Sequence, residues 1–186
     1  MTDRSVLEER LRALGAAAFA HVNGTLEPHL RETERLLRRW GNRDAVCVAG
    51  LYHAVYGTGG IAGHLVGLDA REAIAAVIGV EAERLAYLYG ACDRERFHPR
   101  IGTRLQNRFV DRFTDSEYAI TDPMLRDFCE ITVANELELA LGNADFRRRH
   151  ARALAELFGR MHGLISAGAR GAASDLLVSA NTRETG

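Results

Sequence analysis

The chain has 186 residues, of which 47% are hydrophobic, 26% are charged and only 3 are proline, a composition that suits one compact domain rather than a disordered chain. All 24 basic residues are Arg and they oppose 25 acidic residues, so the net charge of −1 excludes the broad positive field of non-specific nucleic-acid or anionic-membrane binders. The absence of Lys excludes Schiff-base chemistry, a pyridoxal-phosphate anchor and a Walker-type phosphate lysine.

The N-terminus and the cysteines indicate the compartment. Residues 1–12 are strongly charged, and nowhere in the chain do about 18 apolar residues follow one another. Cys47, Cys92 and Cys129 are widely separated, without the spacing of a zinc ribbon or a redox motif. We therefore expect a soluble, cytoplasmic protein with three reduced and mostly buried thiols.

Helical patterns dominate the first half of the chain. Ser5 and Glu8 have the spacing of a capping box and predict a helix from about Val6 to Ala20. Thr25 is expected to cap a second helix that ends at Gly41, with an inward stripe at Leu26, Leu30, Thr33, Leu37 and Trp40 and a solvated face at Arg31, Glu34, Arg35, Arg38 and Arg39. The uncharged residues 45–55 predict a buried third helix, which the Gly-rich residues 57–63 end.

The second half continues the helical pattern. Residues 69–78 and 81–92 read as two further helices, and residues 93–121 read as a long connection with one helical turn or a short hairpin. Helices are then expected over residues 122–142, 144–167 and 173–178, followed by a polar tail at 179–186. The sequence thus predicts a single all-α domain of about seven to eight helices, with its core at about 21–167.

Two histidines occupy inward positions on successive helices. His29 lies on the stripe of the second helix, and His53 lies in the uncharged third helix. Each alone reads as a core histidine with one polar partner, but burying both favours a shared polar site, because each imidazole has two nitrogens to satisfy. Asn135 stands one turn from Ile131 and from Leu139 on the packed face of its helix. We expect His29, His53 and Asn135 to form one catalytic cluster.

Four other residues are candidates for binding a substrate. Tyr56 and Thr58, on the Gly-rich exit from the third helix, could donate hydroxyl protons at the mouth of a cavity, and Thr25 and Asp93 complete this set. The Gly-rich segment also reads simply as a helix stop. The long connection contains arginines four residues apart, at Arg100, Arg104, Arg108 and Arg112. If this segment is helical, they would form one cationic ridge; otherwise they form a solvated face paired with nearby acidic residues. The remaining histidines receive no role: His64, His98, His150 and His162.

Three short stretches resemble the HD-domain superfamily, namely Pro28-His29-Leu30, Leu51-Tyr52-His53-Ala54 and Val133-Ala134-Asn135-Glu136. The pattern from His21 to Leu141 is similar to a divergent, uncharacterised bacterial branch of that superfamily, with an incomplete set of metal ligands. The resemblance implies an HD-like helical domain in which a histidine, a His-Asp pair and a later Asp gather metal. Superfamily members include phosphohydrolases, nucleotidases and di-iron oxygenases, so the resemblance leaves the reaction open.

The ligand set departs from that pattern at two positions. Ala54 stands where the superfamily has an Asp, and Asn135 stands where it has its last Asp. His29 and His53 are therefore an incomplete set of ligands for a single divalent metal, Fe, Mn or Zn, because such sites usually include an anionic ligand. Four other residues could complete it: Asp93, Glu130, Glu138 or His21. A two-metal site is the least expected variant.

These features lead to three hypotheses about function. The first is a small-molecule enzyme, a hydrolase, lyase or oxygenase, that uses His29 and His53 in acid–base or mononuclear-metal chemistry. The second is a non-catalytic ligand-binding or regulatory domain with a decayed metal site. The third is a homodimer formed through the apolar stripe from Leu154 to Ile165. The expected partner is a small molecule, and we expect neither nucleic acid nor a membrane as a partner.

Overall fold

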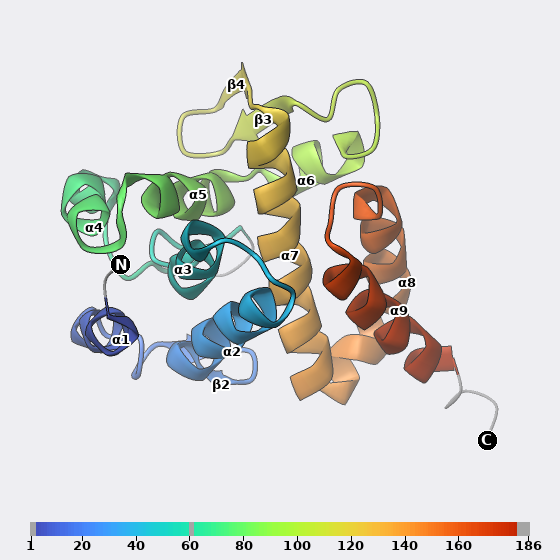
Figure 1. The fold of residues 1–186 in the computed structure, drawn as a ribbon, viewed down its shortest axis with the longest axis horizontal. Coiled ribbons are helices and arrows are strands. Elements are labelled where there is room, and N and C mark those ends of the chain that lie inside the picture. Colours follow the sequence, from blue (N-terminus) through green and yellow to red (C-terminus); the bar gives the residue numbers. More distant parts are fainter. Residues whose placement is uncertain (1–2, 60–61, 182–186) are drawn as a thin grey trace.

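The computed structural model describes residues 3–59 and 62–181, and within them it contains nine α-helices and two small hairpins (Figure 1). The fold is the all-α single domain that the sequence predicts. The helices are α1 Arg4–Ala13, α2 Leu26–Arg39, α3 Asp44–Tyr52, α4 Arg71–Ile78, α5 Val80–Ala91, α6 Arg94–Phe97, α7 Asp122–Gly142, α8 Ala144–Met161 and α9 Ala167–Asn181. Short 3-10 turns occupy Leu68–Ala70 and His98–Arg100.

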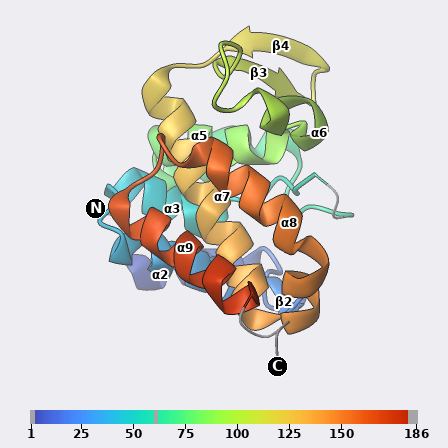
Figure 2. The ribbon, with the colours of Figure 1, turned by 90° about the vertical axis from the view of Figure 1, so that its right-hand side faces the viewer.

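Helix α7 is the axis of the domain. Figures 1 and 2 show it running through the middle, with α2, α3 and α5 on one side and α8 and α9 on the other. Its N-terminus is capped by Thr121, whose hydroxyl accepts a hydrogen bond from the Met124 amide at 3.4 Å, and Pro123 occupies the first turn. Thirteen residues of α7 are buried, because helices cover it on both sides.

Helices α2 and α3 pack closely at Gly50. A Cβ atom built at this glycine would overlap the Cδ1 atom of Leu37, so a side chain here would force the buried Leu37 side chain to move. One interpretation of the outer face of α2 is wrong. Glu34 is only 1% exposed, and it binds Arg38 at 2.6 Å and Arg4 at 2.8 Å, because α1 covers this part of the helix.

The helix boundaries at the two ends of the domain differ from those expected. Helix α1 is capped by Asp3 rather than Ser5 and ends at Ala13, where the chain turns through Gly15 at a φ of 93°. The next residues form a hairpin in which β1 Ala20–His21 pairs antiparallel with β2 Gly24–Thr25. Helix α9 is longer than predicted, and it includes the first residues of the expected polar tail. Residues 182–186 of that tail lie outside the described residues.

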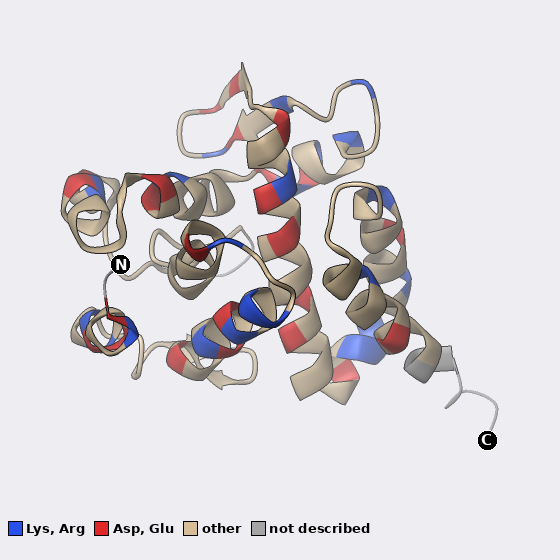
Figure 3. Cartoon of the chain, in the orientation of Figure 1, with Lys and Arg blue, Asp and Glu red and all other residues tan. Residues whose placement is uncertain are grey.

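The long connection contains both structures that the sequence allowed. Helix α6 supplies the helical turn, and β3 Arg108–Asp111 pairs antiparallel with β4 Ser116–Ala119. The four arginines do not form a helical ridge, because they lie in a 3-10 turn, a loop and the hairpin. Arg100 binds Glu117 at 2.9 Å. Figure 3 shows acidic and basic residues mixed along the helices.

Three further expectations concern burial. Cys47, Cys92 and Cys129 are free and buried, as predicted. Within the described part of the chain, no helix is long and apolar enough to cross a membrane. The apolar stripe proposed for dimerisation is not exposed, because α8 packs against α7 and α9 inside the domain. Its buried residues are Leu154, Phe158, Met161 and Ile165.

Candidate functional site

The three residues of the predicted catalytic cluster come together in the core. The Nε2 atom of His29 lies 3.3 Å from the Nε2 atom of His53 and 3.1 Å from the Oδ1 atom of Asn135. These side chains come from α2, the C-terminal cap of α3 and the middle of α7. All three are at most 4% exposed. Their contacts must therefore be satisfied within the protein.

The Nδ1 atom of each histidine, which faces away from the other ring, has a partner of its own. His53 follows the last residue of α3, and its Nδ1–H donates to the carbonyl of Gly50 at 2.7 Å, which pairs one of the free carbonyls at the helix end. The Nδ1 atom of His29 contacts the carboxylate of Glu138 on α7. These two contacts fix the orientation of both rings.

The hydrogen-bond partners also determine which of the two facing Nε2 atoms, that of His29 or that of His53, carries a proton. Since a carbonyl only accepts, the proton of neutral His53 is on Nδ1, and its Nε2 atom holds a lone pair. The Asn135 amide donates to Glu136 at 3.1 Å, which turns its oxygen toward His29. Two acceptors thus face the Nε2 atom of His29, so this atom carries a proton and donates it. A second proton is held between His29 and Glu138.

The surroundings of the cluster favour the neutral forms of His53 and His21. Burial and the nearby His29 hold the pKa of His53 well below its usual range. His21, from β1, stacks on the ring of His29 at a centroid distance of 4.1 Å, and its buried Nδ1 atom has no hydrogen-bond partner. Burial lowers the pKa of His21 to about 4. His53 and His21 are therefore uncharged at neutral pH.

A small cavity of about 30 Å³ adjoins His53, with room for about two water molecules. Ala54, Thr58 and Asn135 also line it, together with the side chain of Arg94. Gly57, which lies on its wall, has a φ of 79°, and a Cβ atom there would overlap the Gly63 carbonyl. Gly57 and Gly63 therefore pass closely over the cavity, whereas α3 has already ended at Tyr52, before the Gly-rich residues that were expected to end it.

A polar path leads from the cluster toward the surface. Glu136 accepts from Asn135 and lies 3.6 Å from the Arg94 guanidinium. Arg94 also donates to the hydroxyl of Tyr89 at 2.9 Å, and the Tyr89 ring contacts His53 edge-on at a centroid distance of 4.8 Å. Burial raises the pKa of Glu136, and Arg94 opposes that shift. The carboxylate of Glu136, next to the histidine cluster, is thus paired with Arg94, which also lines a second, larger pocket.

The donor set fits a resident divalent metal poorly. The inner atoms are the Nε2 lone pair of His53, the protonated Nε2 atom of His29 and an amide oxygen, whereas Zn, Mn and Fe sites usually include a carboxylate or a thiolate. Glu138 is engaged with the outer nitrogen of His29, and Ala54 has no ligand atom. Within residues 3–59 and 62–181, no group of three or more His, Cys, Asp or Glu residues is arranged to hold a metal ion.

The structure divides the predicted substrate-binding set. Thr58 lines the cavity with His53. Tyr56 does not line it, because its hydroxyl donates to buried Glu83 at 2.9 Å. Thr25 is exposed at the start of α2 and its hydroxyl makes no capping hydrogen bond, contrary to expectation. Asp93 caps α6 by accepting from the Arg96 amide at 3.1 Å, away from the histidines.

Among the residues considered as additional ligands, Glu138 and His21 contact His29, but Glu130 does not. Glu130 instead binds the Asn42 amide at 2.9 Å and the Ser166 amide. The periodicity of α7 could have separated the two glutamates, since Glu138 stands one turn from Asn135. Arg94, Glu136 and Tyr89 were not expected at the site, because nothing in their local sequence distinguishes them from surface or core residues.

Comparison with known proteins adds one match. Residues 10–94 are similar to a family described as a domain of unknown function, DUF6817. The matched segment contains His21, His29 and His53, whereas Asn135 and Glu138 lie outside it. No curated protein and no solved structure matches the chain.

Proposed function

We propose that this protein is a small-molecule enzyme of the hydrolase or lyase type on an HD-like helical domain, which works by acid–base chemistry at His29 and His53. The observation that carries the proposal is the 3.3 Å contact between the two Nε2 atoms, in which one proton faces one lone pair. Such a pair can both donate and accept a proton, and the low pKa of His53 leaves its Nε2 lone pair free at neutral pH. The order of the elements and the meeting of α2, α3 and α7 support the HD-like interpretation.

The roles of the residues follow from their contacts. His53 lines the cavity and His29 does not, so the proton of the His29 Nε2 atom reaches the leaving atom of the substrate through His53. Glu138 keeps the other nitrogen of His29 protonated. His53 then takes a proton at Nε2 from water or from the substrate, while its Nδ1–H stays on Gly50. Transfer of this proton back to His29 restores the starting state. Thr58 and Arg94 line the cavity and would position the reacting group.

Turnover by variants tests the proposal. The protein is incubated with panels of phosphate esters, carboxylic esters and hydroxy acids, with a chelator present, and products are followed by mass spectrometry. His53→Gln is expected to lower turnover by about 100-fold or more, because general acid–base catalysis contributes that much. His162→Gln, an exposed control, should keep full activity. A folded His53→Gln protein with full turnover would contradict the proposal.

A second measurement does not need a substrate. Nitrogen-15 NMR of the imidazoles reports which nitrogen of each ring holds a proton. We expect His53 to be protonated at Nδ1 alone and His29 at Nε2. If His53 instead carries its proton at Nε2, it has no lone pair for the relay, and the mechanism is wrong.

A non-catalytic alternative is favoured by one observation. The cavity beside His53 is small, and the methyl group of Ala54 stands where the superfamily has an Asp. In this alternative the domain descends from a metal enzyme and binds a small ligand without turning it over. Turnover that depends on His53 would exclude it.

A further inference from the structure

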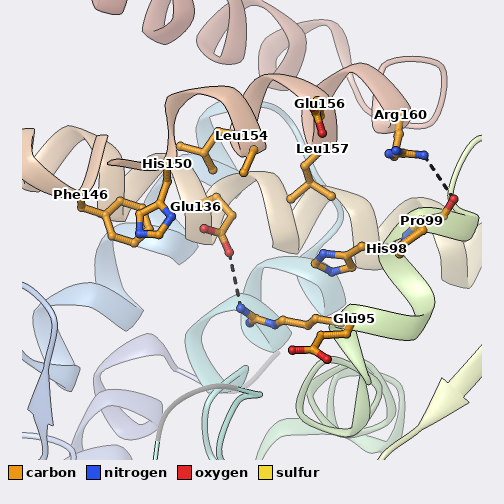
Figure 4. Close-up of a pocket in the computed structure, with 12 residues that line it drawn as sticks. Glu95, His98, Pro99, Glu136, Phe146, His150, Leu154, Glu156, Leu157 and Arg160 are labelled. Carbon is orange, nitrogen blue, oxygen red and sulfur yellow. Dashed lines mark hydrogen bonds and ion pairs between the residues drawn. The ribbon is translucent and has the colours of Figure 1, made fainter. Parts of the chain in front are cut away.

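A second pocket shares the side chain of Arg94 with the cavity beside His53. Figure 4 shows it between α8 and the segment formed by α6 and the following 3-10 turn, with Glu136 at its base. Its volume is about 350 Å³, which falls in the range of small-molecule sites. None of the residues predicted from the sequence to bind a substrate lines this pocket.

One wall of this pocket is apolar. Phe146, Leu154 and Leu157 line it from α8, and Leu154 is only 4% exposed. His150 extends this wall, with its ring 4.4 Å from the ring of Phe146. A hydrocarbon or aromatic group of a ligand would pack favourably here, because both its own apolar surface and that of the wall would be removed from water.

The opposite wall carries hydrogen-bond donors that are incompletely used. The side chain of Arg94 is 27% exposed, and the carboxylate of Glu136 is 3.6 Å from it, longer than a hydrogen bond. Arg160 donates to the Pro99 carbonyl at 3.3 Å and has no carboxylate partner among the residues that the structure describes. His98 points into the same space with a buried Nε2 atom that lacks a partner. A buried polar atom without a partner is costly, which favours a ligand that supplies one.

Three carboxylates line the pocket beside these donors, those of Glu95, Glu136 and Glu156, and Glu136 lies 3.6 Å from Arg94. Glu156 is paired with Arg152 at 3.0 Å, on the outside of α8. Glu136 is held by the Asn135 amide. Within the described residues, none of the three carboxylates makes a hydrogen bond to Arg94 or Arg160, so an anion entering the pocket would meet two guanidinium groups, which are well suited to carboxylates and phosphates.

We propose that this pocket is a binding site for a small organic anion with an apolar body, such as an aryl or alkyl carboxylate or phosphate. Arg94 and Arg160 hold the anionic group, His98 supplies a further hydrogen bond, and the body packs on Phe146, Leu154 and Leu157. The inference does not depend on the proposed reaction, because neither His29 nor His53 lines the pocket. Arg94 lines both cavities, so a ligand bound here would contact the polar path to the histidines.

The test is a calorimetric titration of the whole chain with phenyl phosphate as the probe. Phenol and inorganic phosphate are titrated separately, since each represents one half of the probe. We expect one phenyl phosphate per chain, bound about tenfold or more tightly than either half, because the two walls act together. Arg160→Gln should weaken binding by about tenfold through loss of a charged hydrogen bond.

Two matched pairs of variants locate the site. Ala153 and Ala155 are both exposed on α8, but only Ala153 lines the pocket, so Ala153→Trp should block the probe and Ala155→Trp should not. Arg148 is exposed on the same helix outside the pocket, and Arg148→Gln controls for the lost charge. The proposal is overturned if phenyl phosphate does not bind, if phenol binds equally well, or if Ala153→Trp and Arg160→Gln bind like their controls.

Discussion

Restoring two carboxylates at the histidine cluster should create a metal site. Ala54 lines the same cavity as His53 and Asn135, so Ala54→Asp would place a carboxylate beside both of these residues. Asn135→Asp would replace the amide oxygen that lies 3.1 Å from His29 with an anionic one. Two imidazoles and two carboxylates are a ligand set that Mn, Fe(II) and Zn accept.

We expect the double variant to be destabilised without metal and stabilised by bound metal. Without metal, the double variant buries two carboxylates beside Glu136, and we expect a loss of about 3–5 kcal/mol in the free energy of unfolding. With metal bound at a Kd of about 1 μM, a concentration of about 100 μM adds about 2.7 kcal/mol. For a chain of this size, that corresponds to a rise in Tm of roughly 5–10 °C above the metal-free variant.

The assay combines calorimetric titration with thermal unfolding, with and without each metal. The two single variants are the controls, and each should bind more weakly than the double variant because it offers one carboxylate fewer. If the double variant folds and binds none of the three ions, the four side chains do not surround a common point. The HD-like interpretation of this cluster would then be wrong.

Three further predictions concern packing, pH and thiol reactivity. Gly50→Ala should lower the free energy of unfolding by about 1–3 kcal/mol through overlap with Leu37, whereas Gly159→Ala, with open space around it, should raise it by up to about 1 kcal/mol; thermal unfolding measures both, and equal effects would contradict the close packing. Burial lowers the pKa of His98 to about 4 from 6.5, so below about pH 6.5 the unfolded chain binds the extra proton and stability falls toward pH 4. Urea unfolding should show a slope of at most about 1.4 kcal/mol per pH unit from this group, and His98→Phe should reduce it; an unchanged slope would refute the assignment. Burial raises the pKa of Cys47 to about 11 and that of Cys92 to about 12, so a thiol reagent at pH 8 should label neither until denaturant is added, and rapid labelling of the native protein would contradict their burial.

The sequence alone determined the features that depend on neighbours along the chain. The spacing of apolar residues predicted α2, because a helix brings residues three and four apart to one face, and caps and glycines predicted α5 and α7. A cap followed by Pro123 marked the start of α7 within one residue. The same periodicity placed His29 and Asn135 on inward faces, and the absence of charge over residues 45–55 placed His53 in the core. The structure brings the three together.

The tertiary structure decided which inward and outward residues meet. Glu34 was expected on a solvated face but is buried, because α1, which is distant along the chain, covers it. Glu138 and Glu130 lie on the same helix, yet only Glu138 reaches His29. Periodicity gives the direction of a side chain from its own helix, but its partner depends on how separate helices pack. Arg94 shows the same limit, since its place between two cavities depends on where α6 lies against α7 and α8.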